Sequence, residues 1–282
     1  MTSPPTIAPQ SRDLLRGLGR LLVGLVLVTA IAARPTLATD LGAVGLLWLP
    51  DGVTASTPAA VVIALHESTG VDPRGWHYVD QLTGAGIAVL HLELLENSAD
   101  GFVAPAASDD AALARARLAL AMDLLARDSR VAGAPVGLLA FGSAGHVALQ
   151  AAADPVQGGR IFGLALLYPG CAALAAVARA ERTRPRSPVL LLHGDADPVN
   201  PPADCGNLAD QLARSAPVRR IEYAGAGYAW DLAPYGLHEA VKLPWPGSPG
   251  LVVAVRYWPQ LTELTATQVA SFFAAGVVAY RQ

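Results

Sequence analysis

The chain has 282 residues, of which 52% are apolar and only 15% are charged. This composition supplies one large hydrophobic core and excludes an intrinsically disordered chain. The formal net charge of −3 gives no electrostatic reason to bind nucleic acid, so we expect no nucleic-acid partner.

The N-terminal segment has the pattern of a secretory signal peptide. Arginines precede the apolar run 21–33, and the small residues that follow permit cleavage after Ala32 or Ala38. We therefore expect residues 1–38 to be removed and the protein to be periplasmic or secreted in a bacterium. Cleavage removes four Arg and one Asp, which changes the net charge from −3 to −6. The alternative is an uncleaved anchor, the one case in which we expect membrane contact, but the run is short for a span of about 20 residues.

From residue 41 onward, short apolar runs alternate with stretches of helical periodicity. We expect strands at 45–49, 60–65, 87–92, 162–167, 189–192 and 218–223, and helices at 75–82, 111–127, 207–215 and 265–279. Such alternation predicts an α/β fold, namely a doubly wound, mostly parallel sheet with helices on both faces. No domain boundary is evident, so residues 39–282 are expected to form a single domain.

The central stretch 136–153 predicts a buried strand, a sharp turn and a helix. A nucleophile elbow has this shape, and the residues two before and two after its tip must be small because the strand and helix pass close together. With Ser143 at the tip, one of these positions is Phe141, which is too large. With Gly142 at the tip both are alanine, and glycine adopts the positive φ of such a turn without strain. The spacing favours Gly142, with the Ser143 register as the alternative.

Five segments, taken in order, resemble dienelactone hydrolase and its secreted relatives in the α/β-hydrolase superfamily. They are residues 60–70, 138–149, 168–170, 190–198 and 223–231. The resemblance runs from about residue 42 to the C-terminus, apart from 232–260, which it does not place. It implies an α/β-hydrolase fold and hydrolysis of esters or lactones by a Cys or Ser nucleophile, an acid and a histidine.

The resemblance carries only one member of this triad onto a suitable residue. The acid falls on Asp197, for which a turn-capping role is the alternative, and the nucleophile falls on Gly142. The histidine falls on Tyr228, and a tyrosine with an ordinary pKa of about 10 is a poor general base at neutral pH. Two of the three positions therefore lack the required chemistry.

The oxyanion side of the site is better preserved. In related enzymes the loop after the strand that ends at His66 and Glu67 supplies one backbone N–H, and the residue after the tip, here Ser143, supplies the other. Glu67 also matches a glutamate that lies beside the nucleophile in dienelactone hydrolases. The alternative is that His66 and Glu67 are ordinary strand-end residues. A relocated set of Ser143, Asp197 and His238 remains a further alternative for catalysis.

Other clusters suggest less. His193, Asp195 and Asp197 alternate like metal ligands, but they cross a turn and no second cluster accompanies them, so we expect no metal and no cofactor. The aromatic and proline-rich loop near Trp230 and Trp245 is where we expect ligand contact, and an insertion packed on the body is the alternative.

The sequence contains two cysteines, Cys171 and Cys205. In an oxidising compartment they are expected to form a disulfide, and two buried free thiols are the alternative.

Two classes of function remain. One is a secreted hydrolase of a small ester or lactone that uses a modified site. The other is a non-catalytic member that keeps the fold and the pocket to bind a small molecule, and the missing triad residues favour it. The sequence does not predict an oligomeric state.

Overall fold

The computed structural model describes residues 41–42, 44–67, 69–94, 107–131, 133–180, 184–233, 241–246, 248 and 250–282. The expected signal peptide, residues 1–38, and His238 lie outside the described residues.

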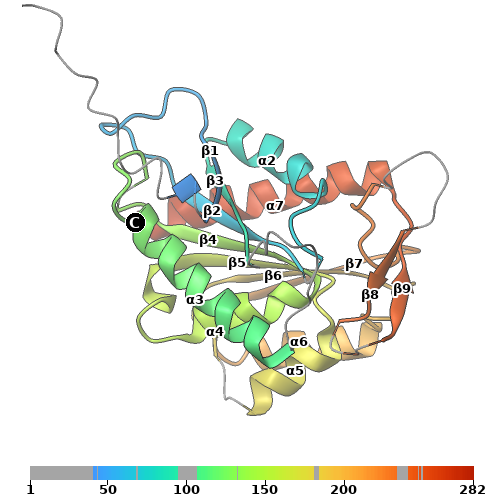
Figure 1. The fold of residues 1–282 in the computed structure, drawn as a ribbon. Coiled ribbons are helices and arrows are strands. Elements are labelled where there is room, and N and C mark those ends of the chain that lie inside the picture. The colour runs from blue at the N-terminus through green and yellow to red at the C-terminus, as the bar shows by residue number, and fades with distance from the viewer. Residues whose placement is uncertain are drawn as a thin grey trace, which may run out of the picture. The chain divides into compact units, whose positions relative to one another are not determined.

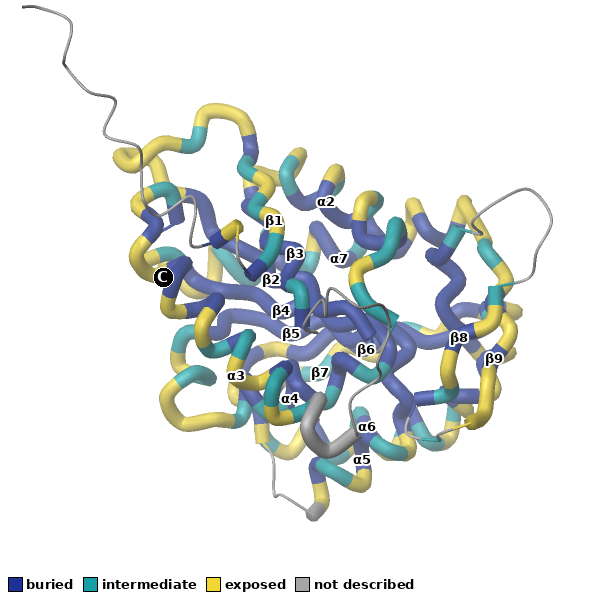
Figure 2. The backbone as a smooth tube through the Cα atoms, viewed as in Figure 1, coloured by how far each residue is buried: buried dark blue, intermediate teal, exposed yellow. Residues whose placement is uncertain are grey.

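Seven strands form one sheet in the order β1-β3-β2-β4-β5-β6-β7. Their bounds are β1 Gly45–Trp48, β2 Val61–Leu65, β3 Ala88–Leu92, β4 Val136–Phe141, β5 Ile161–Leu167, β6 Val189–Gly194 and β7 Val218–Tyr223. Every neighbouring pair is parallel except β1 with β3, which is antiparallel. Strands β2 to β6 are buried along their whole length, as continuous apolar runs in a parallel sheet should be (Figure 2). The predicted doubly wound, mostly parallel sheet is confirmed.

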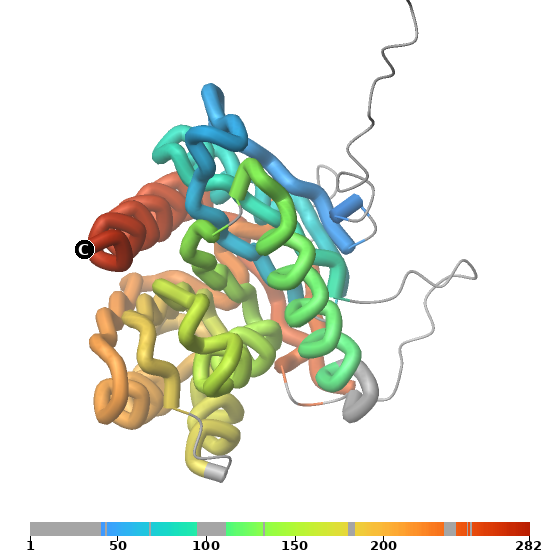
Figure 3. The backbone as a smooth tube through the Cα atoms, turned by 90° about the vertical axis from the view of Figure 1, so that its left-hand side faces the viewer, coloured from blue at the N-terminus to red at the C-terminus, as the bar shows by residue number. Residues whose placement is uncertain are grey.

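Helices cover both faces of this sheet (Figure 1). Helices α2 (Gly75–Gly84) and α7 (Pro259–Tyr280) lie on one face, whereas α3 (Ala107–Leu125), α4 (Gly145–Ala153), α5 (Cys171–Ala180) and α6 (Pro202–Leu212) lie on the other. Figure 3 views α7 and α3 from the side, on opposite sides of the strands. Successive strand residues point into two hydrophobic cores on opposite faces of the sheet. Ile63 packs in the core on the α3 face, and Val62 packs in the core on the α2 face.

The structure extends or adds several elements. Helices α6 and α7 begin earlier than predicted, and each starts with a proline in its first turn, where the missing N–H is not needed. Helix α5 and the two-stranded antiparallel sheet of β8 (Lys242–Pro244) and β9 (Val252–Ala254) were not predicted. In the described part of the chain, α7 alone is long and apolar enough to cross a membrane, but it packs on α2 and β5. This packing explains the apolar composition of α7, because its apolar side chains contribute to the core.

The predicted disulfide is present. Cys171 and Cys205 are bonded, fully buried and separated by 34 residues, and they join the start of α5 to α6.

Candidate functional site

The turn after the central strand is a sharp elbow. Strand β4 ends at Phe141 in an extended conformation, Gly142 has a φ of 51°, and a 3₁₀ turn over Gly142–Ala144 leads directly into α4. This φ lies in the left-handed region that glycine enters without strain. Gly142 is buried, and Ser143 is partly exposed. No hydrogen bond of the Ser143 hydroxyl is found among the described residues.

Two side chains converge over Gly142. Tyr228 Oη donates a 2.6 Å hydrogen bond to Glu67 Oε2, and both side chains are buried. A Cβ added to Gly142 would lie 2.5 Å from Glu67 Oε2 and would also collide with Tyr228 Oη. Glu67 and Tyr228 together therefore fill the space into which any side chain at position 142 would project.

Burial, and then the neighbouring Glu67 carboxylate, raise the pKa of Tyr228 well above its ordinary value. The phenol is therefore neutral and acts as a hydrogen-bond donor. It does not have the properties of a general base at neutral pH.

A buried arginine balances the charge of Glu67. Arg74 Nη1 lies 2.7 Å from Glu67 Oε1, an ion pair by distance although its angles do not make a hydrogen bond. Arg74 also donates to both oxygens of Asp72, at 2.6–2.9 Å. The guanidinium is only 2% exposed and lies over the Phe141 ring. Because a buried carboxylate without a partner is costly, Arg74 stabilises Glu67 in its position over the elbow.

A second buried carboxyl group continues this polar cluster. Tyr168 Oη and Tyr78 Oη donate to the two oxygens of Asp231, at 2.5 and 2.6 Å, and Arg74 Nη1 donates to Tyr168 Oη at 3.3 Å. Burial raises the pKa of Asp231, which is fully inaccessible to solvent. Tyr168 has a φ of 41°, which is strained for a non-glycine residue and holds its ring in this cluster.

Asp197 follows β6 at the same edge of the sheet but makes other contacts. Its carboxylate accepts hydrogen bonds from the Val199 N–H and from Asn200 Nδ2, both at 2.8 Å. Burial raises its pKa to about 6. Asn200 Oδ1 in turn accepts from the N–H groups of Gly170 and Cys171 at the start of α5. The carboxylate is thus tied to the frame that carries the disulfide. Among the described residues it makes no hydrogen bond to Tyr228, whose hydroxyl is bonded to Glu67 instead.

His66 lies beside Glu67, and its ring contacts both neighbouring backbone and the Glu93 side chain, whose Oε1 lies 2.9 Å from Nε2. Its Nδ1 is 2.7 Å from the Glu67 carbonyl oxygen, and its Nε2 accepts the Leu94 N–H at 2.8 Å. His66 and Arg74 line a cavity of about 20 Å³, which is the size of roughly one water molecule. Here His66 orders the loop after β2.

The two tryptophans expected near a ligand differ in burial. Trp230 is fully buried, with its ring centroid 4.9 Å from that of Tyr168. Its Nε1 donates to Thr265 Oγ1 at 3.4 Å. Trp230 is therefore part of the core beneath the site in this structure, and its expected contact with a ligand stays a prediction. Trp245 is half-buried and packs against the same core from the turn after β8.

The predicted site residues lie at one end of the sheet, where the parallel strands have their carboxyl ends. Glu67 follows β2, Gly142 follows β4, Asp197 follows β6 and Tyr228 follows β7, so all four lie beyond carboxyl ends of parallel strands, where ligands bind in such sheets. Sequence reasoning missed the partners that hold them, namely Asp72, Arg74, Tyr78, Tyr168 and Asp231. Tyr168 and Asp231 lie in segments that carried the family resemblance, whereas nothing in the sequence marked Arg74.

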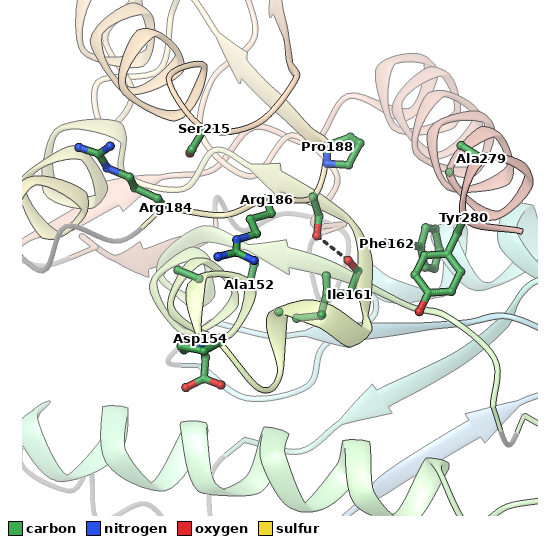
Figure 4. Close-up of a pocket in the computed structure, with 16 residues that line it drawn as sticks. Ala152, Asp154, Ile161, Phe162, Arg184, Arg186, Pro188, Ser215, Ala279 and Tyr280 are labelled. Carbon is green, nitrogen blue, oxygen red and sulfur yellow. Dashed lines mark hydrogen bonds between the residues drawn. The ribbon is translucent and has the colours of Figure 1, made fainter. Parts of the chain in front are cut away.

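A groove of about 770 Å³ lies at the opposite, amino end of the strands. Figure 4 shows Arg184 and Arg186 on one side of it and Phe162 and Tyr280 on the other. This groove is remote from the elbow and from the carboxyl ends of the strands, where parallel sheets have their ligand sites. Within the described ranges, no group of three or more His, Cys, Asp or Glu residues is placed to hold a metal ion.

No protein-family model matches the sequence, and no curated protein matches it either. In three dimensions the chain is similar to a dienelactone hydrolase from Anabaena variabilis, with a TM-score of 0.53, 18% identity and coverage of 83% of this chain and 89% of that one. A dienelactone hydrolase-like promiscuous phosphotriesterase from metagenomic libraries has a TM-score of 0.58 at 22% identity, covering 83% and 94%. Est1E from Butyrivibrio proteoclasticus, solved with ferulic acid, has a TM-score of 0.57 at 14% identity, covering 83% and 95%. At these identities the similarity establishes the α/β-hydrolase fold.

Proposed function

We propose that this protein is a secreted, non-catalytic member of the dienelactone hydrolase type, which binds a small ester, lactone or related molecule without hydrolysing it. One observation carries the proposal: the Tyr228–Glu67 pair occupies the space above Gly142 in which a nucleophile would stand. Covalent hydrolysis of an ester needs a nucleophile with an adjacent base, and no described side chain at the tip of the elbow supplies either.

The fold leaves the means to bind a ligand. The Ser143 N–H follows the tip of the elbow, where related enzymes place an oxyanion donor, and its side chain is partly exposed. The structural relatives named above are hydrolases of this architecture, which supports a small molecule as the ligand. Secretion is supported by the disulfide, because such bonds persist in oxidising compartments.

Hydrolysis of p-nitrophenyl acetate and butyrate tests this proposal. We expect the purified protein and its Ser143→Ala variant to release p-nitrophenol at the buffer rate, beside an active esterase as the positive control. We expect Gly142→Ser to be inactive as well, because the added hydroxyl meets Glu67 and Tyr228, and neither of these described neighbours is a histidine base.

The competing function is an active ester or lactone hydrolase that uses Ser143, Asp197 and a relocated base, His238. It is favoured only by the partial exposure of Ser143 beside the tip. Turnover by the wild type that Ser143→Ala abolishes would refute the non-catalytic proposal and establish this one.

A further inference from the structure

The two edges of the sheet differ in charge. Strand β7, at one edge, has the sequence VRRIEY and carries Arg219, Arg220 and Glu222. Strand β1, at the other edge, has the sequence GLLW, and residues 44–50 contain no charged side chain. Charges on an edge strand prevent pairing with another chain, and uncharged edges allow it. The β1 edge therefore lacks the protection that the β7 edge has.

Strand β1 also has backbone groups available for pairing. The Glu93 N–H donates to the Val44 carbonyl at 2.9 Å, continuing the antiparallel β1–β3 ladder by one pair. Bonded and non-bonded pairs alternate in such a ladder, so Leu46 and Trp48 bond to β3. Gly45 and Leu47 consequently turn their N–H and C=O groups outward, where no described residue pairs with them.

Large apolar side chains stand beside this edge. Leu46 is 56% exposed and Trp48 is 36% exposed, and both point to the α2 face of the sheet. Trp76 of α2 is 44% exposed, and its ring centroid lies 5.0 Å from that of Trp48. Contiguous exposed apolar side chains of this kind mark interaction surfaces. We call Leu46, Trp48 and Trp76, together with the outward backbone of β1, the β1 surface.

We infer that the β1 surface pairs with the β1 surface of a second copy of this chain, joining the two sheets. A two-fold axis perpendicular to the sheet makes the two strands antiparallel and keeps equivalent faces together. Residues that lie opposite one another in the two β1 strands must then have their side chains on the same face of the sheet. The outward N–H and C=O groups of one strand must also face those of the other. Both conditions hold when the axis passes midway between the Leu47 residues of the two copies. Leu47 of each copy then exchanges hydrogen bonds with Leu47 of the other, and Leu46 lies opposite Trp48 of the second copy.

The size of this surface sets the strength of association. Its three side chains expose on the order of 300 Å² in each copy, below the roughly 800 Å² that a standard interface takes from each partner. The strand pairing adds directional hydrogen bonds. Association is therefore reversible and depends on concentration, with a Kd in the range of about 10 to 100 µM.

Sedimentation velocity of the purified protein from about 1 to 200 µM tests the inference, because this range brackets the expected Kd. The wild type should shift from monomer to dimer with concentration. Leu46→Lys places a charge on the edge and should raise the Kd at least about tenfold. Leu47→Pro removes the outward N–H without breaking a bond to β3, and should have the same effect. The matched control is Leu251→Lys, at a residue that is 58% exposed on the turn before β9, and it should leave the Kd unchanged.

Far-UV circular dichroism checks that each variant is folded. A wild type that remains monomeric throughout the range overturns the inference. So does self-association that persists unchanged in folded Leu46→Lys and Leu47→Pro.

Discussion

Replacement of Gly142 by alanine measures how tightly the elbow is closed. The backbone has a φ of 51° there, and an alanine in the left-handed region costs about 1 to 2 kcal/mol. The new Cβ also meets Tyr228 Oη and Glu67 Oε2, so the hydrogen bond between them must open. A hydrogen bond to a charged acceptor contributes about 1.5 to 3 kcal/mol. We therefore expect Gly142→Ala to lower the free energy of unfolding by about 2.5 to 5 kcal/mol.

Two comparisons separate these contributions in equilibrium urea denaturation followed by circular dichroism. Gly86 has a φ of 78° and no atom within 4 Å of an added Cβ, so Gly86→Ala isolates the backbone cost. In a Tyr228→Phe background the hydroxyl is already absent, so Gly142→Ala should cost about 1.5 to 3 kcal/mol less than in the wild type. Two results would show that the contact over the elbow is not formed. One is a cost for Gly142→Ala that is no larger than the cost for Gly86→Ala. The other is additivity of Gly142→Ala and Tyr228→Phe within about 0.5 kcal/mol.

Two further predictions concern Asp197 and export. Burial raises the pKa of Asp197 to about 6, so the folded state binds this proton more tightly than the unfolded chain does. The stability that the protonated group contributes is therefore fully present below about pH 4 and is lost as the pH rises through 6. We expect up to about 3 kcal/mol across this window, measured as the difference in stability between the wild type and Asp197→Asn; identical pH profiles would contradict it. The intact mass of protein exported by a bacterial host should correspond to cleavage after Ala32 or Ala38, and an uncleaved mass in the membrane fraction would instead indicate an anchor.

Local signals in the sequence located most of the fold. Continuous apolar runs such as 60–65 identified strands buried on both faces, and small residues around Gly142 identified the turn that has a φ of 51°. The unpredicted elements have weaker signals. Helix α5 is rich in alanine, which fits many contexts, and β8 and β9 are each three residues long. The orientation of β1 is not a local property at all, because it depends on the β1–β3 pairing.

The site divides in the same way. The sequence by itself determined that Gly142 has no side chain and that Glu67 and Asp197 follow strands. It also led to the prediction that Tyr228 stands where the resemblance expects a histidine. Only the tertiary structure decided how these residues act, because hydrogen bonds and burial depend on atoms far apart in the chain. Tyr228 and Glu67 are 161 residues apart, yet they meet over the elbow. Arg74, which no sequence pattern marked, neutralises Glu67 because folding buries both.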